Sequence, residues 1–281
     1  MTDVPAAAER RGFFARKAYE SLVRRTSQAT AGFDAKSALV VAPHQDDETL
    51  GCGGVIARKV RADAAVSVAF LTDGGGSHAH LIDRDELCRL RKSEALDACR
   101  VLGIPASRVH FMEVPDGALA QSEGAAATFV SELLAELRPQ QVFTPHAEDM
   151  LSDHVAANRI VHRALGKAPQ RTTVCEYPIW LWDRWPWTNP IAFPRQRHGG
   201  KSRGKFALSA LDWRMHRHFT TRVDVGGTLE SKRAALATHL TQVTRFNGDP
   251  GWLTLSDIDH GNWLANSLGK YEFFRETEFG E

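Results

Sequence analysis

A histidine and three acidic residues lie within five positions of one another, directly after a short apolar run. His44 and the acids at 46–48 follow residues 38–41, which predict a buried strand that ends at Pro43. Charged groups this dense are costly to remove from water unless a cation or a substrate offsets them. The acids can instead complement the dipole of a following helix. Their spacing alone leaves both interpretations open.

A second cluster of a histidine and acids follows another predicted strand. Residues 141–144 predict that strand, and a helix that ends near residue 165 comes after it. Ser152 or Asp153 can serve as the N-cap of this helix, which places His154 in its first turn. In an open α/β sheet, ligands bind at the carboxyl ends of the strands, so both clusters are expected at that edge.

The two clusters can supply two imidazoles and one carboxylate to a single point. His44 and Asp47 are three residues apart, so one tight turn can aim both, and a parallel sheet can bring His154 alongside. Such a His₂Asp set suits zinc and leaves a position open for water. Zinc polarises a carbonyl and lowers the pKa of bound water, which is what amide hydrolysis needs. The adjacent Asp46 can accept the water proton as a general base.

Strands and helices alternate along the chain up to about residue 165. This alternation predicts an α/β fold whose mostly parallel sheet has helices on both faces, with the site at the carboxyl ends of the strands. The predicted strands are 38–41, 65–71, 109–114, 141–144 and 172–182. The predicted helices are 49–61, 85–102, 124–137, one ending near 165, and 229–240.

We expect one domain over residues 35–281, preceded by an N-terminal segment at residues 1–34. Residues 10–25 of that segment predict an amphipathic basic helix, which can dock on the core or touch a membrane surface peripherally. A Trp-rich insert at about 180–213 holds five of the seven tryptophans. Aromatic side chains of this kind can line a substrate pocket or form a small satellite core.

Composition excludes several classes of protein. The 281 residues are 43% hydrophobic and 25% charged, and the formal net charge of +1 gives no argument for nucleic acid. No apolar run reaches about 18 residues, so no membrane span is expected. The four cysteines lack paired spacing, which predicts reduced thiols and a cytoplasmic location. The oligomeric state stays open.

Two motifs resemble those of a known family. Pro43-His44-Gln45-Asp46-Asp47-Glu48 resembles the AHPDDE motif of the PIG-L (LmbE-like) zinc N-deacetylases, and Ser152-Asp153-His154 resembles the end of their HPDH motif. The resemblance spans residues 38–165 and continues weakly through 232–234 and 239–242. It implies a Rossmann-like domain that removes an N-acetyl (or N-acyl) group from a small N-acetylglucosamine-type sugar conjugate.

The resemblance also implies a metal site and a base. The implied ligands are His44, Asp47 and His154, which would hold one Zn²⁺ per chain, although another divalent metal can occupy such a set. Asp46 would be the base that activates water.

Further site residues follow from the resemblance. Arg91 and Asp116 match positions that hold sugar hydroxyls, and Asp153 can either orient a ligand histidine or cap a helix. Leu151 stands where the family has a histidine that assists the tetrahedral intermediate or the leaving amine, so another donor is needed. His146 is the first candidate. Other candidates are His78, His80 and His239.

Two other functions compete with the deacetylase. A catalytically impaired or specialised homologue that binds zinc and sugar is the alternative that Leu151 raises. A dinucleotide-dependent enzyme is disfavoured, because the glycine run at 51–54 has Ile56 where the GxGxxG pattern needs its third glycine. The acids ahead of the helix would also repel a pyrophosphate.

Overall fold

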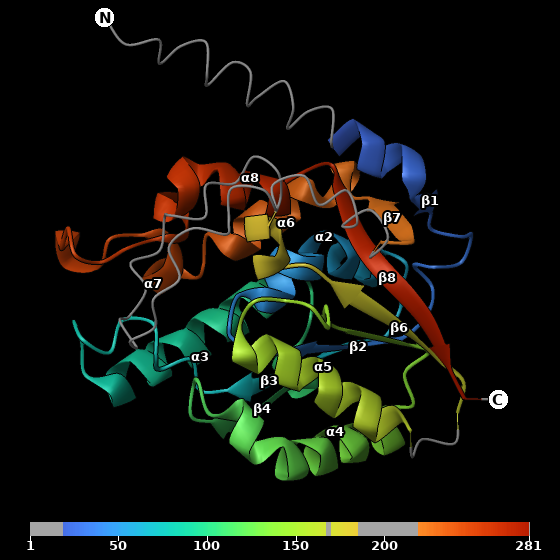
Figure 1. The fold of residues 1–281 in the computed structure, drawn as a ribbon, viewed down its shortest axis with the longest axis horizontal. Helices are drawn as coiled ribbons and strands as arrows, with labels where there is room; N and C mark the ends of the chain where they lie inside the picture. The colour runs from blue at the N-terminus through green and yellow to red at the C-terminus, as the bar shows by residue number, and fades with distance from the viewer. Residues whose placement is uncertain (1–18, 167–169, 185–218, 281) are drawn as a thin grey trace, which may run out of the picture.

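The structure is a computed structural model that describes residues 19–166, 170–184 and 219–280 (Figure 1). The strands are β1 Ser27–Gln28, β2 Ala38–Ala42, β3 Val66–Thr72, β4 Val109–Val114, β5 Gln141–Pro145, β6 Thr172–Tyr177, β7 Thr221–Asp224 and β8 Tyr271–Phe279. The α-helices are α2 Asp47–Arg61, α3 Arg84–Val101, α4 Glu123–Leu137, α5 Ser152–Leu165, α6 Leu229–Leu236, α7 Leu240–Val243 and α8 Asn262–Ser267, and residues 19–25 are also helical.

The described strands form one eight-stranded sheet in the order β1-β7-β8-β6-β5-β2-β3-β4. Every pairing is parallel except those of β8, which runs antiparallel to both β6 and β7. The predicted mostly parallel α/β fold is therefore confirmed. The chain passes from β2 outward to β3 and β4 and then returns to β5 on the other side of β2, so the strand order reverses between β2 and β5.

Both faces of the sheet are covered, which explains why its central strands are buried along their whole length and mostly apolar. In β2, Ala38, Val40 and Ala42 join one buried cluster, whereas Leu39 and Val41 join the other. Side chains alternate between faces along a strand, so each β2 residue has a helix layer to pack against. Helices α2, α3 and α6 contribute to the first cluster, and α4 and α5 cover the opposite face (Figure 1).

One predicted strand and one predicted helix end earlier in the structure than the sequence indicates. The strand predicted over 172–182 ends at Tyr177, because a proline follows and the chain turns into a 3₁₀-helix, η3, at Trp180–Arg184. The helix predicted over 229–240 ends at Leu236, and α7 begins four residues later. His239 leaves the helical path between them.

Helix α2 is broken near its middle, and residues of β8 and α6 hold it in place through hydrogen bonds. Cys52 has non-helical angles (φ −148°, ψ 20°), so a second helical stretch starts after it. The carboxylate of Glu272 on β8 accepts from the backbone N–H groups of Gly54 and Val55, each at 2.8 Å. Lys232 of α6 donates to the same carboxylate at 2.7 Å, and both side chains are buried. This pair fixes the helix that begins beside the site.

The N-terminal segment and the tryptophan insert are described in part. Residues 10–18 of the predicted amphipathic helix and residues 185–213 of the insert lie outside the described residues. Leu22 is fully buried, and Tyr19 makes an edge contact with Phe273 at 5.8 Å, so residues 19–25 pack on the core.

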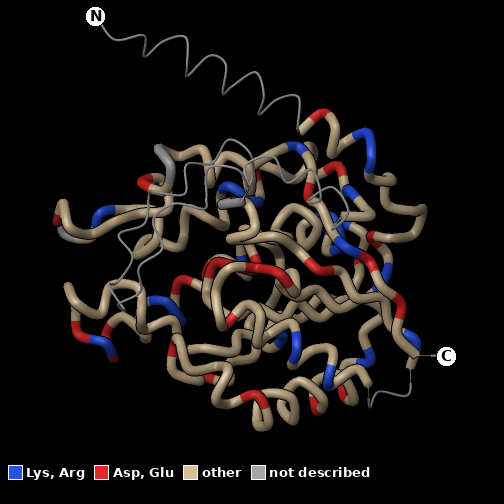
Figure 2. Tube along the Cα trace, in the orientation of Figure 1, with Lys and Arg blue, Asp and Glu red and all other residues tan. Residues whose placement is uncertain are grey.

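Charged residues are spread over the part of the chain that the structure describes (Figure 2). Acidic and basic residues are interspersed along the described trace (Figure 2). None of the described helices is both long and apolar enough to cross a membrane. All four cysteines are free, as predicted.

Candidate metal centre

The reversal of strand order between β2 and β5 gathers the two histidine clusters at one edge of the sheet. His44 follows the carboxyl end of β2, and Asp47 is the first residue of α2. His154 lies in the first turn of α5, which follows β5. Crevices at such a reversal are the usual ligand sites of open α/β sheets.

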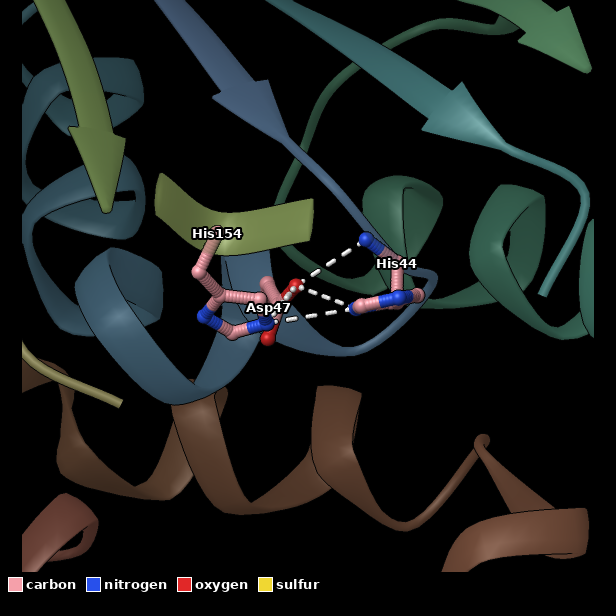
Figure 3. A group of neighbouring side chains, drawn as sticks. All are labelled: His44, Asp47 and His154. Carbon is pink, nitrogen blue, oxygen red and sulfur yellow. Dashed lines mark hydrogen bonds and ion pairs between the residues drawn. The ribbon is translucent and has the colours of Figure 1, made fainter. Parts of the chain in front are cut away.

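Three ligand atoms form a nearly equilateral triangle (Figure 3). His44 Nδ1 lies 3.2 Å from His154 Nε2, and Asp47 Oδ2 lies 3.3 Å from each of these nitrogens. Ligand atoms about 2.0–2.1 Å from a tetrahedral ion stand about 3.3–3.4 Å apart. The triangle therefore has the dimensions of one face of a tetrahedral metal site, so the residues fit the ion that the sequence implies.

The buried ionisable groups of this site shift one another's pKa values. Burial raises the pKa of Asp47, but the neighbouring His154 and His44 outweigh it and hold that pKa well below its usual range. Burial lowers the pKa of His154, but Asp47 and Asp149 outweigh it and raise the pKa to about 9. A metal ion binds only a neutral imidazole, so it would displace any second proton that these histidines hold.

Asp46 occupies an unusual backbone conformation beside the triangle. Its φ of 155° and ψ of −21° are sparsely populated for a residue with a side chain, and its N–H donates to Glu48 Oε2 at 3.0 Å. Burial raises the pKa of Asp46 to about 6, although the Arg91 guanidinium opposes the shift. A strained acid next to a candidate metal position suits a base, which is the role predicted for it.

Arg91 reaches this turn from α3 and is 97% buried, with 3% of its surface exposed. Its Nη2 donates to the carbonyl of Gln45 at 2.6 Å and lies 3.3 Å from Asp46 Oδ2. The guanidinium therefore holds the turn that carries Asp46, the predicted base. That Arg91 also holds a sugar hydroxyl stays a prediction.

The second nitrogen of His44 faces two further carboxylates. Asp116 Oδ1 lies 3.2 Å from His44 Nε2, and Asp153 Oδ2 lies 3.5 Å from it. Carboxylates on the outer nitrogen of a ligand histidine fix its tautomer and orientation. The geometry gives Asp153 the orienting position predicted for it and places Asp116 there too. Sugar binding by Asp116 stays a prediction.

The predicted cap of α5 is wrong. The N-cap residue is Leu151, and it makes no side-chain cap hydrogen bond, so neither Ser152 nor Asp153 takes that position. The Asp153 carboxylate instead accepts from the backbone N–H groups of Gly117 (2.7 Å) and Leu119 (3.2 Å). The acid thereby ties α5 to the turn after β4.

His146 is not brought into either group of metal-ligating atoms found in the described chain. The side chain is fully buried, its Nδ1 accepts from the N–H of Glu148 at 3.0 Å, and its Nε2 lies 3.7 Å from Glu176 Oε2. The two nitrogens therefore face a backbone N–H of the loop after β5 and a carboxylate on β6. The geometry thus supports a structural role, and the catalytic role predicted for His146 gains no support from it.

Two of the other candidate histidines also contact groups outside the triangle. His239 Nε2 lies 3.1 Å from the buried carboxylate of Glu48, and the ring of His78 stacks on Trp252 with centroids 4.1 Å apart. His80 is exposed. Leu151 itself is 38% exposed.

The sequence interpretation missed Asp149. Its Oδ1 lies 3.5 Å from the outer nitrogen of His154, and the side chain is buried. An acid shortly before a suspected ligand histidine, in the run His146-Ala147-Glu148-Asp149, was the available signal.

Comparison with known proteins agrees with this geometry. Residues 39–165 match the PIG-L family, described as GlcNAc-PI de-N-acetylase. A 1D-myo-inositol 2-acetamido-2-deoxy-alpha-D-glucopyranoside deacetylase of Rhodococcus opacus is 31% identical over 245 residues, 73% of this chain and 81% of that protein. The protein of the same name from Segniliparus rotundus is 30% identical over 75% of this chain and 78% of its own length.

A solved structure shares the fold. The N,N'-diacetylchitobiose deacetylase of Pyrococcus horikoshii is similar over 99% of this chain and 94% of its own, with a TM-score of 0.62 and 18% identity. The motif resemblance is thus confirmed by the match over the two motif regions and by relatives that share most of the chain. This chain belongs to the PIG-L family.

Proposed function

We propose that this chain is a metal-dependent hydrolase that removes an N-acetyl group from an N-acetylglucosamine-type sugar conjugate. The single observation that carries the proposal is the triangle of His44 Nδ1, Asp47 Oδ2 and His154 Nε2, with edges of 3.2–3.3 Å, beside the strained acid Asp46. The deacetylase names of the relatives from Rhodococcus opacus and Segniliparus rotundus support the substrate class.

The metal would be held by His44, Asp47 and His154. When bound, Zn²⁺ would polarise the amide carbonyl and make water more acidic. One Zn²⁺ per chain is our proposal, and the same ligand set also suits other divalent transition metals.

The chain itself would move the protons. Hydrolysis adds a water oxygen to the acetyl carbonyl carbon, breaks the C–N bond, and yields acetate and the free amine. The Asp46 carboxylate would accept a proton from the attacking water, and its protonated form could return that proton to the departing nitrogen. Arg91 would keep the carboxylate in place through its contacts with Gln45 and Asp46.

One observation favours a second candidate, a homologue that binds metal and sugar but turns over slowly. Leu151 cannot donate a proton or stabilise an oxyanion. Loss of one oxyanion donor costs about 10²–10³ in rate. Turnover of an N-acetyl sugar distinguishes the two candidates.

The test is amine release from N-acetylglucosaminides, including an inositol conjugate, by the metal-loaded chain. Asp46→Asn should abolish release while metal binding persists. The matched control Asp97→Asn alters an exposed acid on α3 and should leave release unchanged. Full release by Asp46→Asn would refute the assigned base. Metal binding without any release by the wild type would favour the second candidate.

A further inference from the structure

The loop between β5 and α5 contains a buried carboxylate for which the proposed reaction has no direct use. Asp149 is 4% exposed as a residue, and its side chain is fully buried. Its Oδ2 accepts from the backbone N–H groups of Ile179 and Trp180, each at 3.1 Å, and of Leu181 at 3.4 Å. Its Oδ1 accepts from its neighbour's N–H, that of Met150, at 2.7 Å. Both oxygens therefore act as acceptors, and the surrounding backbone fixes their directions.

The same Oδ1 faces the ligand histidine. It lies 3.5 Å from Nδ1 of His154, and that nitrogen is buried with no shorter hydrogen bond within the described chain. On the other side of the ring, Nε2 faces Asp47 Oδ2 and His44 Nδ1. The imidazole thus stands between a carboxylate that accepts a proton and the position where a metal needs a lone pair.

A neutral imidazole carries one N–H, and the partner of one nitrogen decides the state of the other. We propose that Asp149 is a positioning residue that keeps the hydrogen of His154 on Nδ1 and so presents the Nε2 lone pair to the metal. This inference rests on the proposed function, since it concerns the same metal site. It extends that function to a residue that touches neither metal nor substrate.

Backbone hydrogen bonds also hold this loop in place, and they do not involve the Asp149 carboxylate. The N–H of Asp149 donates to the carbonyl of His146 at 3.0 Å, and the N–H of His146 donates to the carbonyl of Tyr177 on β6 at 2.8 Å. These bonds remain when the side chain at 149 is changed. A substitution there should therefore change the histidine more than the fold.

Asp149→Asn is the sharpest variant because an amide has only one acceptor oxygen. The three N–H groups of residues 179–181 demand that oxygen, so the NH₂ group would face Nδ1 of His154. Nδ1 would then have to accept, the hydrogen would move to Nε2, and the metal position would lose its lone pair. Loss of such an orienting partner typically costs about 10–100-fold in metal affinity.

The experiment is a zinc titration against a chromophoric chelator for wild type, Asp149→Asn and the matched control Glu148→Gln, whose acid is exposed. We expect Asp149→Asn to bind zinc at least about tenfold more weakly and Glu148→Gln to match the wild type. Circular dichroism and the thermal midpoint establish that each variant is folded. Wild-type zinc affinity in folded Asp149→Asn would overturn the inference.

Long-range ¹⁵N–¹H correlation spectra of the zinc-loaded wild type give a readout that a merely structural role would not produce. His154 should show a protonated Nδ1 and a metal-bound Nε2; the reverse assignment would overturn the inference even if Asp149→Asn failed to fold. If the wild type bound no zinc, the proposed function would fail by itself. The tautomer of His154 in the metal-free chain at alkaline pH, where the imidazole is neutral, would still decide the role of Asp149.

Discussion

Two roles are possible for Arg91, and steady-state kinetics can tell them apart. A residue that binds the sugar and a residue that positions the proposed base affect kcat and KM differently. The resemblance places this residue against a sugar hydroxyl, whereas the structure places its guanidinium on Gln45 and Asp46 at 2.6 and 3.3 Å. We therefore predict that Arg91→Gln lowers kcat and leaves KM nearly unchanged. An interaction made only in the transition state has that signature, whereas lost ground-state binding raises KM.

The contacts set the size of the effect. A hydrogen bond to a charged group contributes about 1.5–3 kcal/mol, and each 1.36 kcal/mol changes a rate about tenfold. Misplacing Asp46 by losing one such contact should therefore lower kcat about 10- to 150-fold. Arg91→Lys should lower kcat by a smaller factor than Arg91→Gln. An ammonium group can keep a positive charge near Asp46 but cannot contact both Asp46 and the Gln45 carbonyl.

The assay is steady-state amine release over a range of substrate concentrations. Lys92→Gln is the matched control on the same helix, because this lysine is 45% exposed and pairs with Glu113 at 2.6 Å, away from the turn. It should match the wild type. A rise in KM with unchanged kcat in Arg91→Gln would refute the positioning role and restore the sugar contact.

Three further outcomes follow from the structure. Lys232→Met leaves a buried carboxylate without its cation and should lower the free energy of unfolding by about 3–5 kcal/mol in urea titrations, whereas the exposed Lys270→Met should not move the midpoint; equal effects would contradict this. Leu151→His should restore a donor and raise kcat about 10²–10³-fold, and an unchanged kcat would mean that another group already supplies it. Burial lowers the pKa of His239, but Glu48 outweighs it and the net shift is upward. The imidazolium should therefore stabilise the metal-free fold below about pH 6.5 and lose that effect as pH rises through the folded-state pKa. The stability gap between wild type and His239→Gln should thus be larger at about pH 6 than at about pH 9, and an equal gap would contradict the assignment.

The parallel half of the fold was predictable because its strands are buried on both faces. Residues 38–41 and 66–71 are buried at every position, are apolar except for Ser67, and alternate with helices of clear periodicity. The edge was not predictable from pattern. β1 has two residues and β7 has four, which is too short for a recognisable pattern, and β8 mixes charged residues with aromatics although it lies between β7 and β6.

The site was predictable in its ligand types but not in its supporting contacts. His44, Asp47 and His154 stand in motifs whose order survives in the sequence. The partners of the outer nitrogens, Asp116 and Asp149, depend on where turns place a carboxylate across the fold. A turn sequence contains little information about that distance.

In the proposed function, one metal ion binds to His44, Asp47 and His154, and hydrolysis depends on this ion. Metal content by mass spectrometry, measured on the same samples as amine release for wild type and His154→Ala, tests it most directly. We predict one equivalent of metal with release in the wild type and loss of both in the variant. A folded wild type that releases amine without metal would contradict it.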